Sequence, residues 1–375
     1  MPACEDPRVH RAPLVRLPPE LAPPGAGGGG ESARVQSGAD SRGNGDGASA
    51  RFVLGIDGGA TKTLAALLDL ERGTLHLGQA GPSNEDAVGT GRAVDALLAA
   101  AEEAIGRAGI DGERLDAEVI ALAGTDTDAV TRHVRAARSE DWLVVNDVVA
   151  AWATATEAQP GVGVISGTGS NVFGVGFDGR SWRAGGWGHQ LGDEGSGYWF
   201  GTESIKAALR DREASGPETA LSEAAVEFFG VASVEALAAR VYSKPLSKGE
   251  IAAFAIETAK LAAAGDAVAC EIYRRGAELL GEQVAAVIRR TGLRGSFPVG
   301  LIGSAYKAGV VFVEPLTRAV HELAPEARVA VVEMAPVGGS LLLAMRACGC
   351  EGALSANELA GLIDEALGAE SSAAA

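Results

Sequence analysis

The feature that most constrains the fold of this chain is an order of secondary-structure signals that occurs twice. Each half reads as three apolar strands followed by helix, strand, helix, strand and helix, the order βββαβαβα. Each half opens on a strand that ends in a glycine turn, GIDGGATKT at residues 55–63 and GVISGTGSN at residues 163–171. A duplicated α/β unit predicts two lobes with a cleft between them, where nucleotides and small substrates bind.

Hydrophobic periodicity and turn residues give the expected elements of both copies. In the first copy we expect strands at 51–59, 64–70 and 74–81, a helix at 92–109, a strand at 118–124, a helix at 126–138, a strand at 142–146 and a helix at 147–157. In the second we expect strands at 161–169, 171–177 and 181–186, alanine-rich helices from about 202 to 290, a strand at 297–303, a helix at 310–323, a strand at 328–333 and a helix from 337.

These elements divide the 375 residues into three parts. Residues 1–50 hold seven of the 15 prolines and show hardly any apolar periodicity, so this segment is expected to be a disordered tail. Residues 51–160 are predicted to form the N-terminal lobe. Residues 161–375 are predicted to form the C-terminal lobe, with a helical insertion at about 202–290.

The charge and the cysteine content limit which partners and which cellular compartment are expected. The formal net charge of −17 argues against nucleic acid or an anionic membrane as a partner, because both need clustered Lys and Arg. Four scattered cysteines are too few for a disulfide framework and suit a reducing cytoplasm. No apolar run reaches membrane-spanning length, and the first residues lack a signal-peptide pattern. A cytoplasmic location is therefore expected.

The two glycine turns predict a phosphate site. Gly58 and Gly59 let backbone N–H groups approach phosphate oxygens, Thr61 can donate a further hydrogen bond, and Asp57 at the strand end can hold Mg²⁺. Taken alone, this turn could equally be a plain hairpin, and the spacing is not that of a Walker loop. The second turn, Ser166–Asn171, repeats the pattern of glycine and hydroxyl residues, which favours a polyphosphate held by both.

A third stretch, GGWGHQLGDEGSGYWFG at Gly185–Gly201, places the acid pair Asp193–Glu194 among seven glycines and two tryptophans. Glycine-rich backbone is unsuited to a core element, and a simple surface loop would not retain such aromatic side chains. We expect a binding loop that runs into a helix, with Asp193 directed at a ligand.

These motifs resemble the BadF/BadG/BcrA/BcrD branch of the actin/hexokinase/Hsp70 ATPase superfamily, the branch that includes N-acetylglucosamine kinase. The resemblance extends from residue 52 to about 345 and implies a two-lobed actin-like ATPase fold, which is ribonuclease H-like. The segments that carry it, in family order, are GIDGGATKT, GPSN, LAGTD, VVNDVVAAWATAT, GVISGTGSN, GGWGHQLGDEGSGYW and GLIGSAY.

The resemblance assigns roles to individual residues. Asp147 matches the catalytic base, which accepts the proton of a sugar hydroxyl, although its position also suits a helix N-cap. The matches to ATP and phosphate contacts are Gly58, Gly59, Thr61, Thr168, Gly303 and Ser304. The matches to sugar contacts are Asn84, Ser170, Asn171, Gly186, Trp187, Gly188 and Asp193. Asp57 remains the expected Mg²⁺ ligand.

The implied activity is ATP-dependent phosphorylation of the 6-hydroxyl of N-acetylglucosamine, with ATP and an amino sugar as partners. Independently of the resemblance, the long alanine-rich helical insertion offers a surface on which a homodimer could form. The sequence departs from the animal kinases at Asp86, where they carry an aromatic residue, so glucosamine or N-acetylmuramic acid is an alternative substrate. An ATPase module that activates a radical dehydratase or reductase is a different class. It needs cysteines for an iron–sulfur cluster, and residues 51–269 contain none. A sugar-binding regulator without catalysis is a third possibility, disfavoured by the presence of Asp147.

Overall fold

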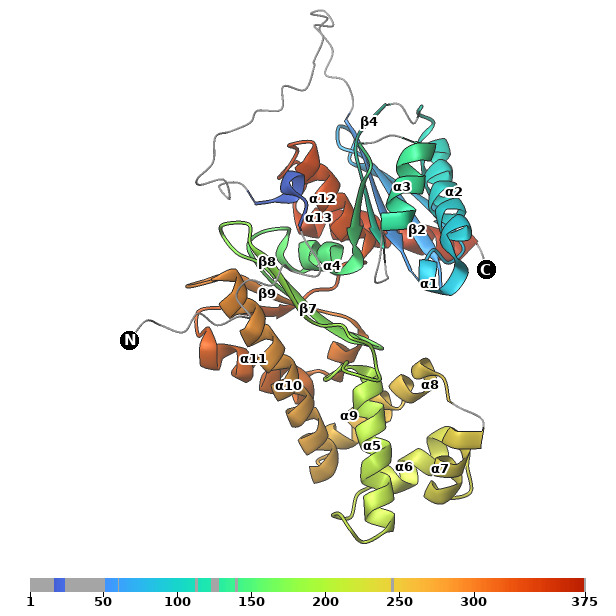
Figure 1. Ribbon diagram of the computed structural model, residues 1–375, viewed down its shortest axis with the longest axis vertical. Helices are drawn as coiled ribbons and strands as arrows, with labels where there is room; N and C mark the ends of the chain where they lie inside the picture. The colour runs from blue at the N-terminus through green and yellow to red at the C-terminus, as the bar shows by residue number, and fades with distance from the viewer. Residues whose placement is uncertain are drawn as a thin grey trace, which may run out of the picture. The chain divides into compact units, whose positions relative to one another are not determined.

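A computed structural model of the chain describes residues 17–23, 51–59, 61–111, 114–122, 128–138, 141–243 and 246–373 (Figure 1). It divides into two compact units, which are treated separately below. The N-terminal unit comprises Leu17–Ala158, Phe177–Gly179 and Met334–Ala375, and the C-terminal unit comprises Gln159–Gly176 and Arg180–Glu333.

The N-terminal unit is built on a five-stranded mixed sheet of order β3-β2-β1-β4-β5. β1 pairs antiparallel with β2 and parallel with β4, and β5 extends the parallel part. The carboxyl ends of β1, β4 and β5 therefore meet at one edge of the sheet, where α/β proteins place ligands. The strands are β1 (Phe52–Gly58), β2 (Thr63–Asp69), β3 (Thr74–Ala80), β4 (Leu115–Leu122) and β5 (Leu143–Asn146).

The helices of this unit cover the sheet with small apolar side chains. α2 packs its buried alanines against β2 and β3, close enough that a Cβ on Gly78 would lie 2.1 Å from the carbonyl oxygen of Ala100. The helices that follow β3, β4 and β5 are α1 (Glu85–Val88), α2 (Thr90–Ala108), α3 (Asp128–Ala137) and α4 (Asp147–Thr156).

The C-terminal end of the chain also belongs to this unit, which differs from the predicted boundary of 161–375. α12 (Val337–Ala347) packs on β1, β4 and α4, and α13 (Ala356–Ala373) packs on β3. Glycine makes the approach possible, since a Cβ on Gly55 would lie 2.7 Å from the amide nitrogen of Leu341. The Ser340 hydroxyl also donates to the Ile56 carbonyl at 2.9 Å. Close backbone packing of this kind produces no periodic pattern in the sequence, so the sequence did not predict that α12 packs on the N-terminal sheet. The helix α13 was not predicted at all.

The predicted disorder of residues 1–50 is wrong for the short segment 17–23. There Pro19–Leu21 forms a 3-10 turn, and Leu21 is fully buried against α12. The Arg346 guanidinium reaches the Leu21 carbonyl, which ties the segment to this helix. The remainder of residues 1–50 lies outside the described part of the chain.

The C-terminal unit repeats the same sheet, with the order β10-β9-β6-β7-β8. β6 pairs antiparallel with β7 and parallel with β9, as β1 does with β2 and β4. The predicted duplication of an actin/hexokinase-like α/β fold is therefore confirmed. The strands are β6 (Gly161–Ser166), β7 (Ser170–Val175), β8 (Ser181–Gly185), β9 (Pro298–Ile302) and β10 (Arg328–Val331).

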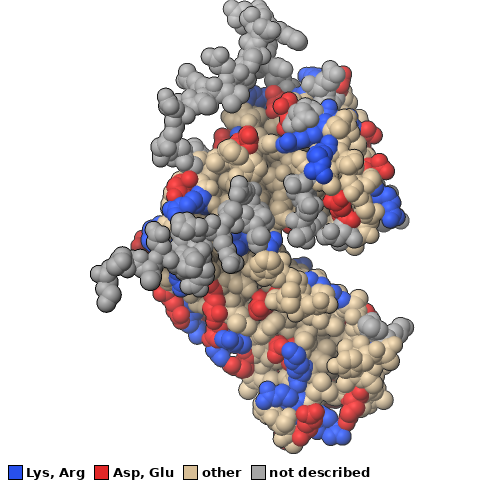
Figure 2. Space-filling model, viewed as in Figure 1, with Lys and Arg blue, Asp and Glu red and all other residues tan. Residues whose placement is uncertain are grey.

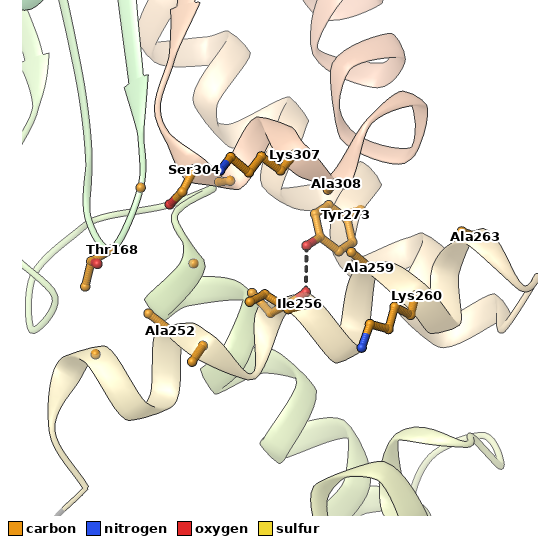
Figure 3. A pocket seen from close by; sticks show the side chains of 16 residues that line it. Thr168, Ala252, Ile256, Ala259, Lys260, Ala263, Tyr273, Ser304, Lys307 and Ala308 are labelled. Atoms are coloured by element: carbon orange, nitrogen blue, oxygen red, sulfur yellow. Dashed lines mark hydrogen bonds between the residues drawn. The ribbon is translucent and has the colours of Figure 1, made fainter. Parts of the chain in front are cut away.

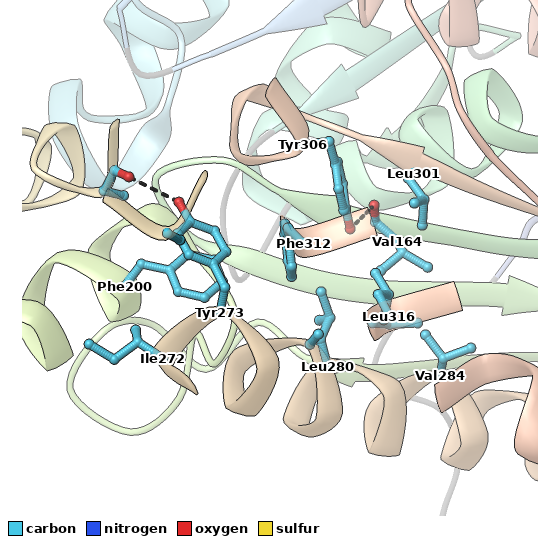
Figure 4. Close-up of a cluster of buried hydrophobic side chains, with 14 of the residues drawn as sticks. Val164, Phe200, Ile272, Tyr273, Leu280, Val284, Leu301, Tyr306, Phe312 and Leu316 are labelled. Carbon is cyan, nitrogen blue, oxygen red and sulfur yellow. Dashed lines mark hydrogen bonds between the residues drawn. The ribbon is translucent and has the colours of Figure 1, made fainter. Parts of the chain in front are cut away.

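A helical insertion follows β8, as predicted, and the aromatic core of this unit lies where its helices meet the sheet (Figure 4). Phe200 stacks on Tyr273 with ring centroids 4.2 Å apart and meets the edge of Phe312 at 5.0 Å. The helices are α5 (Gly197–Arg212), α6 (Leu221–Phe229), α7 (Val234–Ser243), α8 (Lys248–Ala253), α9 (Ala255–Ala263), α10 (Ala267–Thr291) and α11 (Val310–Leu323), with the 3-10 turn η3 (Ser304–Ala308).

The charged surface is mixed rather than segregated. Figure 2 shows acidic and basic side chains interspersed on the visible face. Many are paired within helices, as Arg274 is with Glu271, and such exposed pairs contribute little stability. Across the described residues, no helix combines the length and the apolarity needed to cross a membrane.

Candidate active site

Two predicted site residues, Asp57 and Asp147, lie on the carboxyl edge of the N-terminal sheet or beside it. Asp57 is the penultimate residue of β1, and its neighbours on β4 and β5 are Ala121 and Val145. Asp147 follows two residues after Val145, so it stands two strands from Asp57, a lateral spacing of roughly 10 Å. Sheet pairing thus brings the expected metal ligand and the expected base to one edge.

Asp57 sits in an environment that disfavours its charged form. Burial raises the pKa of the Asp57 carboxyl to about 6, and the nearby Lys62 ammonium limits the rise. A cation that binds the carboxylate would offset this cost. No group of three or more His, Cys, Asp or Glu suited to a metal occurs in the part of the chain described. Asp57 alone would offer one carboxylate ligand to Mg²⁺, and phosphate oxygens and water would have to supply the others.

The Gly58–Gly59 turn is joined to the GPSN segment. The amide of Ser83 donates to the Gly59 carbonyl at 3.0 Å, and the hydroxyl of Thr63 donates to Ser83 Oγ at 2.8 Å. A Cβ on Gly58 would lie 2.6 Å from Ser83 Oγ, so glycine is required there. Thr61 is exposed beyond the turn, which leaves its hydroxyl accessible to a ligand.

Asn84 follows Ser83 and has an unsatisfied polar atom. It occupies the N-cap position of α1 without using its side chain as a cap. Its Oδ1 is buried and has no hydrogen-bond partner among the described residues. Since buried polar atoms are nearly always paired, a ligand hydroxyl that donated to this oxygen would satisfy it.

Asp147 is the first residue of α4, and its side chain is half-buried. The capping role belongs to Asn146, whose Oδ1 accepts from the Val148 amide at 3.2 Å. The alternative interpretation of Asp147 as the N-cap is therefore wrong. Its carboxylate stands in the first helical turn, where the helix dipole favours a negative charge.

In the C-terminal unit, the glycine turn Gly167–Gly169 is held by the loop that precedes α5. The Ser166 hydroxyl donates to the Gly195 carbonyl at 2.7 Å, and the Ser170 hydroxyl donates to the Glu194 carbonyl at 2.8 Å. On the other side, the Gly197 amide donates to the Gly167 carbonyl at 2.8 Å. The loop does run into a helix, as predicted, and it holds the glycine turn in place.

Asp193 occupies the centre of this loop in an unusual conformation. Its φ is +64°, its side chain is 4% exposed, and Lys248 Nζ donates to its Oδ2 at 2.7 Å. Its Oδ1 accepts a longer hydrogen bond of 3.4 Å from the Ser170 amide. The carboxylate predicted to bind sugar thus has a cationic partner that local sequence did not indicate.

The residues predicted to frame the sugar lie together at the start of the loop. Asn171 pairs with Gly185 across β7 and β8. A Cβ on Gly186 would lie 2.4 Å from Nδ2 of the Asn171 side chain. The Asn171 Oδ1 is buried and, like that of Asn84, has no partner in the described part of the chain. Trp187 is 58% exposed, with the Arg183 guanidinium 5.3 Å from its ring centre, and Gly188 follows with φ +82°. An exposed ring can still provide a stacking face.

A cavity of about 650 Å³ opens beside the glycine turn (Figure 3). Thr168 and Ser304 lie toward one end, and Lys260 and Ala263 lie toward the other. Its wall is mostly the small apolar side chains of α9 and η3, with the Tyr273 hydroxyl donating to the Ala255 carbonyl. The volume and the polar end suit a nucleotide whose base lies among alanines and whose phosphates reach the turn.

Gly303 directly precedes Ser304, which lines this cavity. With φ +122°, it would place a Cβ 2.2 Å from the Ser166 carbonyl oxygen, so β9 and β6 approach too closely there for any side chain. Ser304 then begins η3 at the cavity wall. The predicted contacts Thr168, Gly303 and Ser304 are thus brought together.

Sequence reasoning missed polar residues from the helical insertion. Lys248 on α8 and Lys260 on α9 come from helices in which the sequence analysis identified no ligand-binding motif. Gln283 on α10 donates from its Nε2 to Glu194 at 3.0 Å, while its buried Oε1 has no partner among the described residues. Tertiary packing alone reveals these side chains.

Comparison with known proteins assigns the chain to a family. The model of the BadF/BadG/BcrA/BcrD ATPase family matches residues 54–344. The chain belongs to this family.

Two curated relatives match over most of their length. An N-acetylmuramic acid/N-acetylglucosamine kinase from Clostridium acetobutylicum is 35% identical over 243 residues, which are 64% of this chain and 79% of the relative. An N-acetyl-D-glucosamine kinase from Dictyostelium discoideum is 26% identical over 317 residues, 79% of this chain and 98% of the relative.

Solved structures agree on the fold. A candidate N-acetylglucosamine kinase from Chromobacterium violaceum superimposes with a TM-score of 0.61 at 24% identity, covering 79% of this chain and 99% of the other. A second candidate kinase of this kind, from Porphyromonas gingivalis, gives a TM-score of 0.58 at 21% identity, covering 79% and 98%.

Proposed function

We propose that the protein is an ATP-dependent sugar kinase that phosphorylates the 6-hydroxyl of N-acetylglucosamine. The sugar-kinase class is supported by the two curated relatives, both kinases of amino sugars, and by the family of the chain. The observation in the fold that carries the proposal is made in each unit separately. Each unit has one asparagine expected to bind sugar, Asn84 or Asn171, whose buried amide oxygen has no hydrogen-bond partner among the described residues.

The proposed chemistry assigns one role to each group. Asp147 accepts the proton of the sugar hydroxyl as its oxygen bonds to the γ-phosphorus, the bond from that phosphorus to the β-phosphate oxygen breaks, and ADP leaves. Asp57 would hold Mg²⁺, which supplies charge neutralisation on the phosphates. Thr168 and the N–H groups of the glycine turns would orient the phosphates. Because the transition state of phosphoryl transfer is loose, a weak base is sufficient.

The choice of sugar depends on the segment after Asn84. Glu85 accepts a hydrogen bond from the Thr90 hydroxyl, which fixes it to the start of α2. The next acid, Asp86, has a side chain outside the described part of the structure. An acid at that place would attract the ammonium of glucosamine and repel the lactyl carboxylate of N-acetylmuramic acid.

The substrate is tested by kcat/KM for N-acetylglucosamine, glucosamine and N-acetylmuramic acid with Mg²⁺-ATP. We expect N-acetylglucosamine to give the highest value. A preference for glucosamine that disappears in Asp86→Asn would move the assignment to glucosamine. A preference for N-acetylmuramic acid would show that Asp86 does not face the sugar.

Asp193 is tested by Asp193→Asn, because asparagine tolerates the left-handed backbone that alanine does not. We expect the KM for sugar to rise about tenfold or more, since a charge-assisted hydrogen bond is replaced by a weaker one. Glu203→Gln, on the solvent side of α5, is the control and should leave the KM unchanged. An unaltered KM in Asp193→Asn would remove this residue from the sugar site.

A further inference from the structure

Lys248 stands out among the residues without an assigned role, because its backbone is rigidly placed. It begins α8, where Ser247 and Glu250 form a reciprocal capping box with hydrogen bonds of 3.2 and 2.8 Å. α8 packs directly on α5, since a Cβ on Gly201 would lie 2.0 Å from the Ile251 carbonyl oxygen. The insertion helix therefore delivers Lys248 to a fixed position beside the loop before α5.

The ammonium of Lys248 reaches the glycine turn. A Cβ on Gly169 would lie 3.0 Å from Lys248 Nζ and 3.0 Å from Asp193 Oδ2, so both groups rest against the turn. Gly167 and Thr168 of the same turn line the 650 Å³ cavity, as does Gly249, the residue after Lys248. The ammonium of Lys248 does not itself line the cavity, but it lies against the turn whose residues Gly167 and Thr168 do, a position that suits the phosphates of a nucleotide bound there.

The pairing with Asp193 leaves this charge available. The Asp193 side chain is 4% exposed, whereas that of Lys248 is 34% exposed. A buried carboxylate needs a cationic partner, and here it takes one of the three N–H donors of the ammonium. The ammonium has two further N–H donors, and the 34% exposure of the Lys248 side chain leaves room for a ligand to approach it. Lys260, at the opposite end of the cavity, is paired with Glu257 at 2.8 Å on the surface.

We propose that Lys248 binds the β- or γ-phosphate oxygens of ATP at the turn Gly167–Gly169, and that Asp193 holds it in position. The inference rests on the proposed function in taking ATP as the ligand. It adds a phosphate-binding residue from the helical insertion to the contacts that the turns supply. The alternative is that Lys248 serves only to neutralise Asp193. The two roles are distinguishable, because a phosphate contact affects the affinity for ADP and ATP more than the affinity for AMP.

The test is calorimetric binding of AMP, ADP and Mg²⁺-ATP, without sugar, to Lys248→Met. A lost charge-assisted contact should weaken ADP or ATP binding by about tenfold to a hundredfold while AMP changes less than twofold. Lys206→Met is the matched control, because Lys206 forms a pair of the same 2.7 Å length with Glu203 on the exposed face of α5. All three nucleotides should bind the control as they bind the wild type.

A second variant separates phosphate binding from instability, since Lys248→Met leaves a buried carboxylate without its partner. The double variant Asp193→Asn/Lys248→Met removes both charges and should show the same loss for ADP and ATP with a wild-type melting temperature. Unchanged ADP and ATP affinities in the double variant would overturn the inference, and so would an equal loss for AMP. The binding test contains no sugar, so its result does not depend on the kinase activity. If the wild type bound ATP in this test but phosphorylated no sugar in a separate activity assay, only the kinase proposal would be refuted.

Discussion

Replacing Asp147 with asparagine should lower kcat by about two to four orders of magnitude and leave substrate binding nearly intact. The amide cannot take the proton of the sugar hydroxyl, but it has the shape of the carboxyl group. The helix should survive the change, because Asn146 and not Asp147 caps α4. The measurement is kcat from ADP release, together with calorimetric dissociation constants for sugar and nucleotide.

Glu223→Gln provides the control for this prediction. Glu223 is an exposed acid in the first turn of α6, so its loss removes a similar interaction with the helix dipole without touching the site. We expect wild-type turnover from this variant. If Asp147→Asn also turned over at a near-normal rate, the assignment of Asp147 as the base would be wrong.

Replacing Asp57 with asparagine should have opposite effects on activity and stability. Turnover should fall by about a hundredfold or more, because a neutral amide is a poor ligand for Mg²⁺. The free energy of unfolding at pH 8 should rise by about 2 kcal/mol, because the variant no longer buries a carboxylate whose pKa is raised to about 6.

The pH dependence of the stability fixes the sign of this effect. A raised pKa means that Asp57 adds most to stability when it is protonated, and that this contribution is lost as the pH rises through about 6. The stability difference between Asp57→Asn and wild type should therefore be near zero below pH 4 and largest above pH 7. Urea unfolding without metal at pH 4, 6 and 8 measures it.

Asp69→Asn is the contrasting variant. Asp69 is equally part of the N-terminal sheet, but its Oδ1 accepts from the amides of Glu71 and Arg72 at 3.0 Å, so its charge is satisfied. Asparagine should destabilise the protein there. A gain of stability in Asp69→Asn, or no pH-dependent gain in Asp57→Asn, would contradict the account of the Asp57 environment.

Much of the fold could be predicted from local patterns. The alternation of apolar residues and glycine turns gave both copies of the β-sheet, and the helix expected at 310–323 has those bounds. Such elements are predictable because they are determined by residues close together in the sequence. The strand ends then placed Asp57 and Asp147 at one edge through sheet pairing alone.

The failures involve contacts between distant segments. α12 was assigned to the second copy by its order, yet glycine-mediated contacts place it on β1 and α4. Lys248 lies 55 residues from Asp193, and their pairing depends on how α8 packs on α5. The periodicity of a sequence does not reveal a lysine that approaches from a distant helix. The site residues predicted from motifs therefore included Asp193 but not its cationic partner Lys248.

The central claim is tested most directly by ADP release with Mg²⁺-ATP in the presence and absence of N-acetylglucosamine, with the product examined by NMR. The account predicts one ADP for each N-acetylglucosamine 6-phosphate formed and negligible release without sugar. ADP release that proceeds equally without any sugar would contradict the kinase assignment and favour an ATPase module.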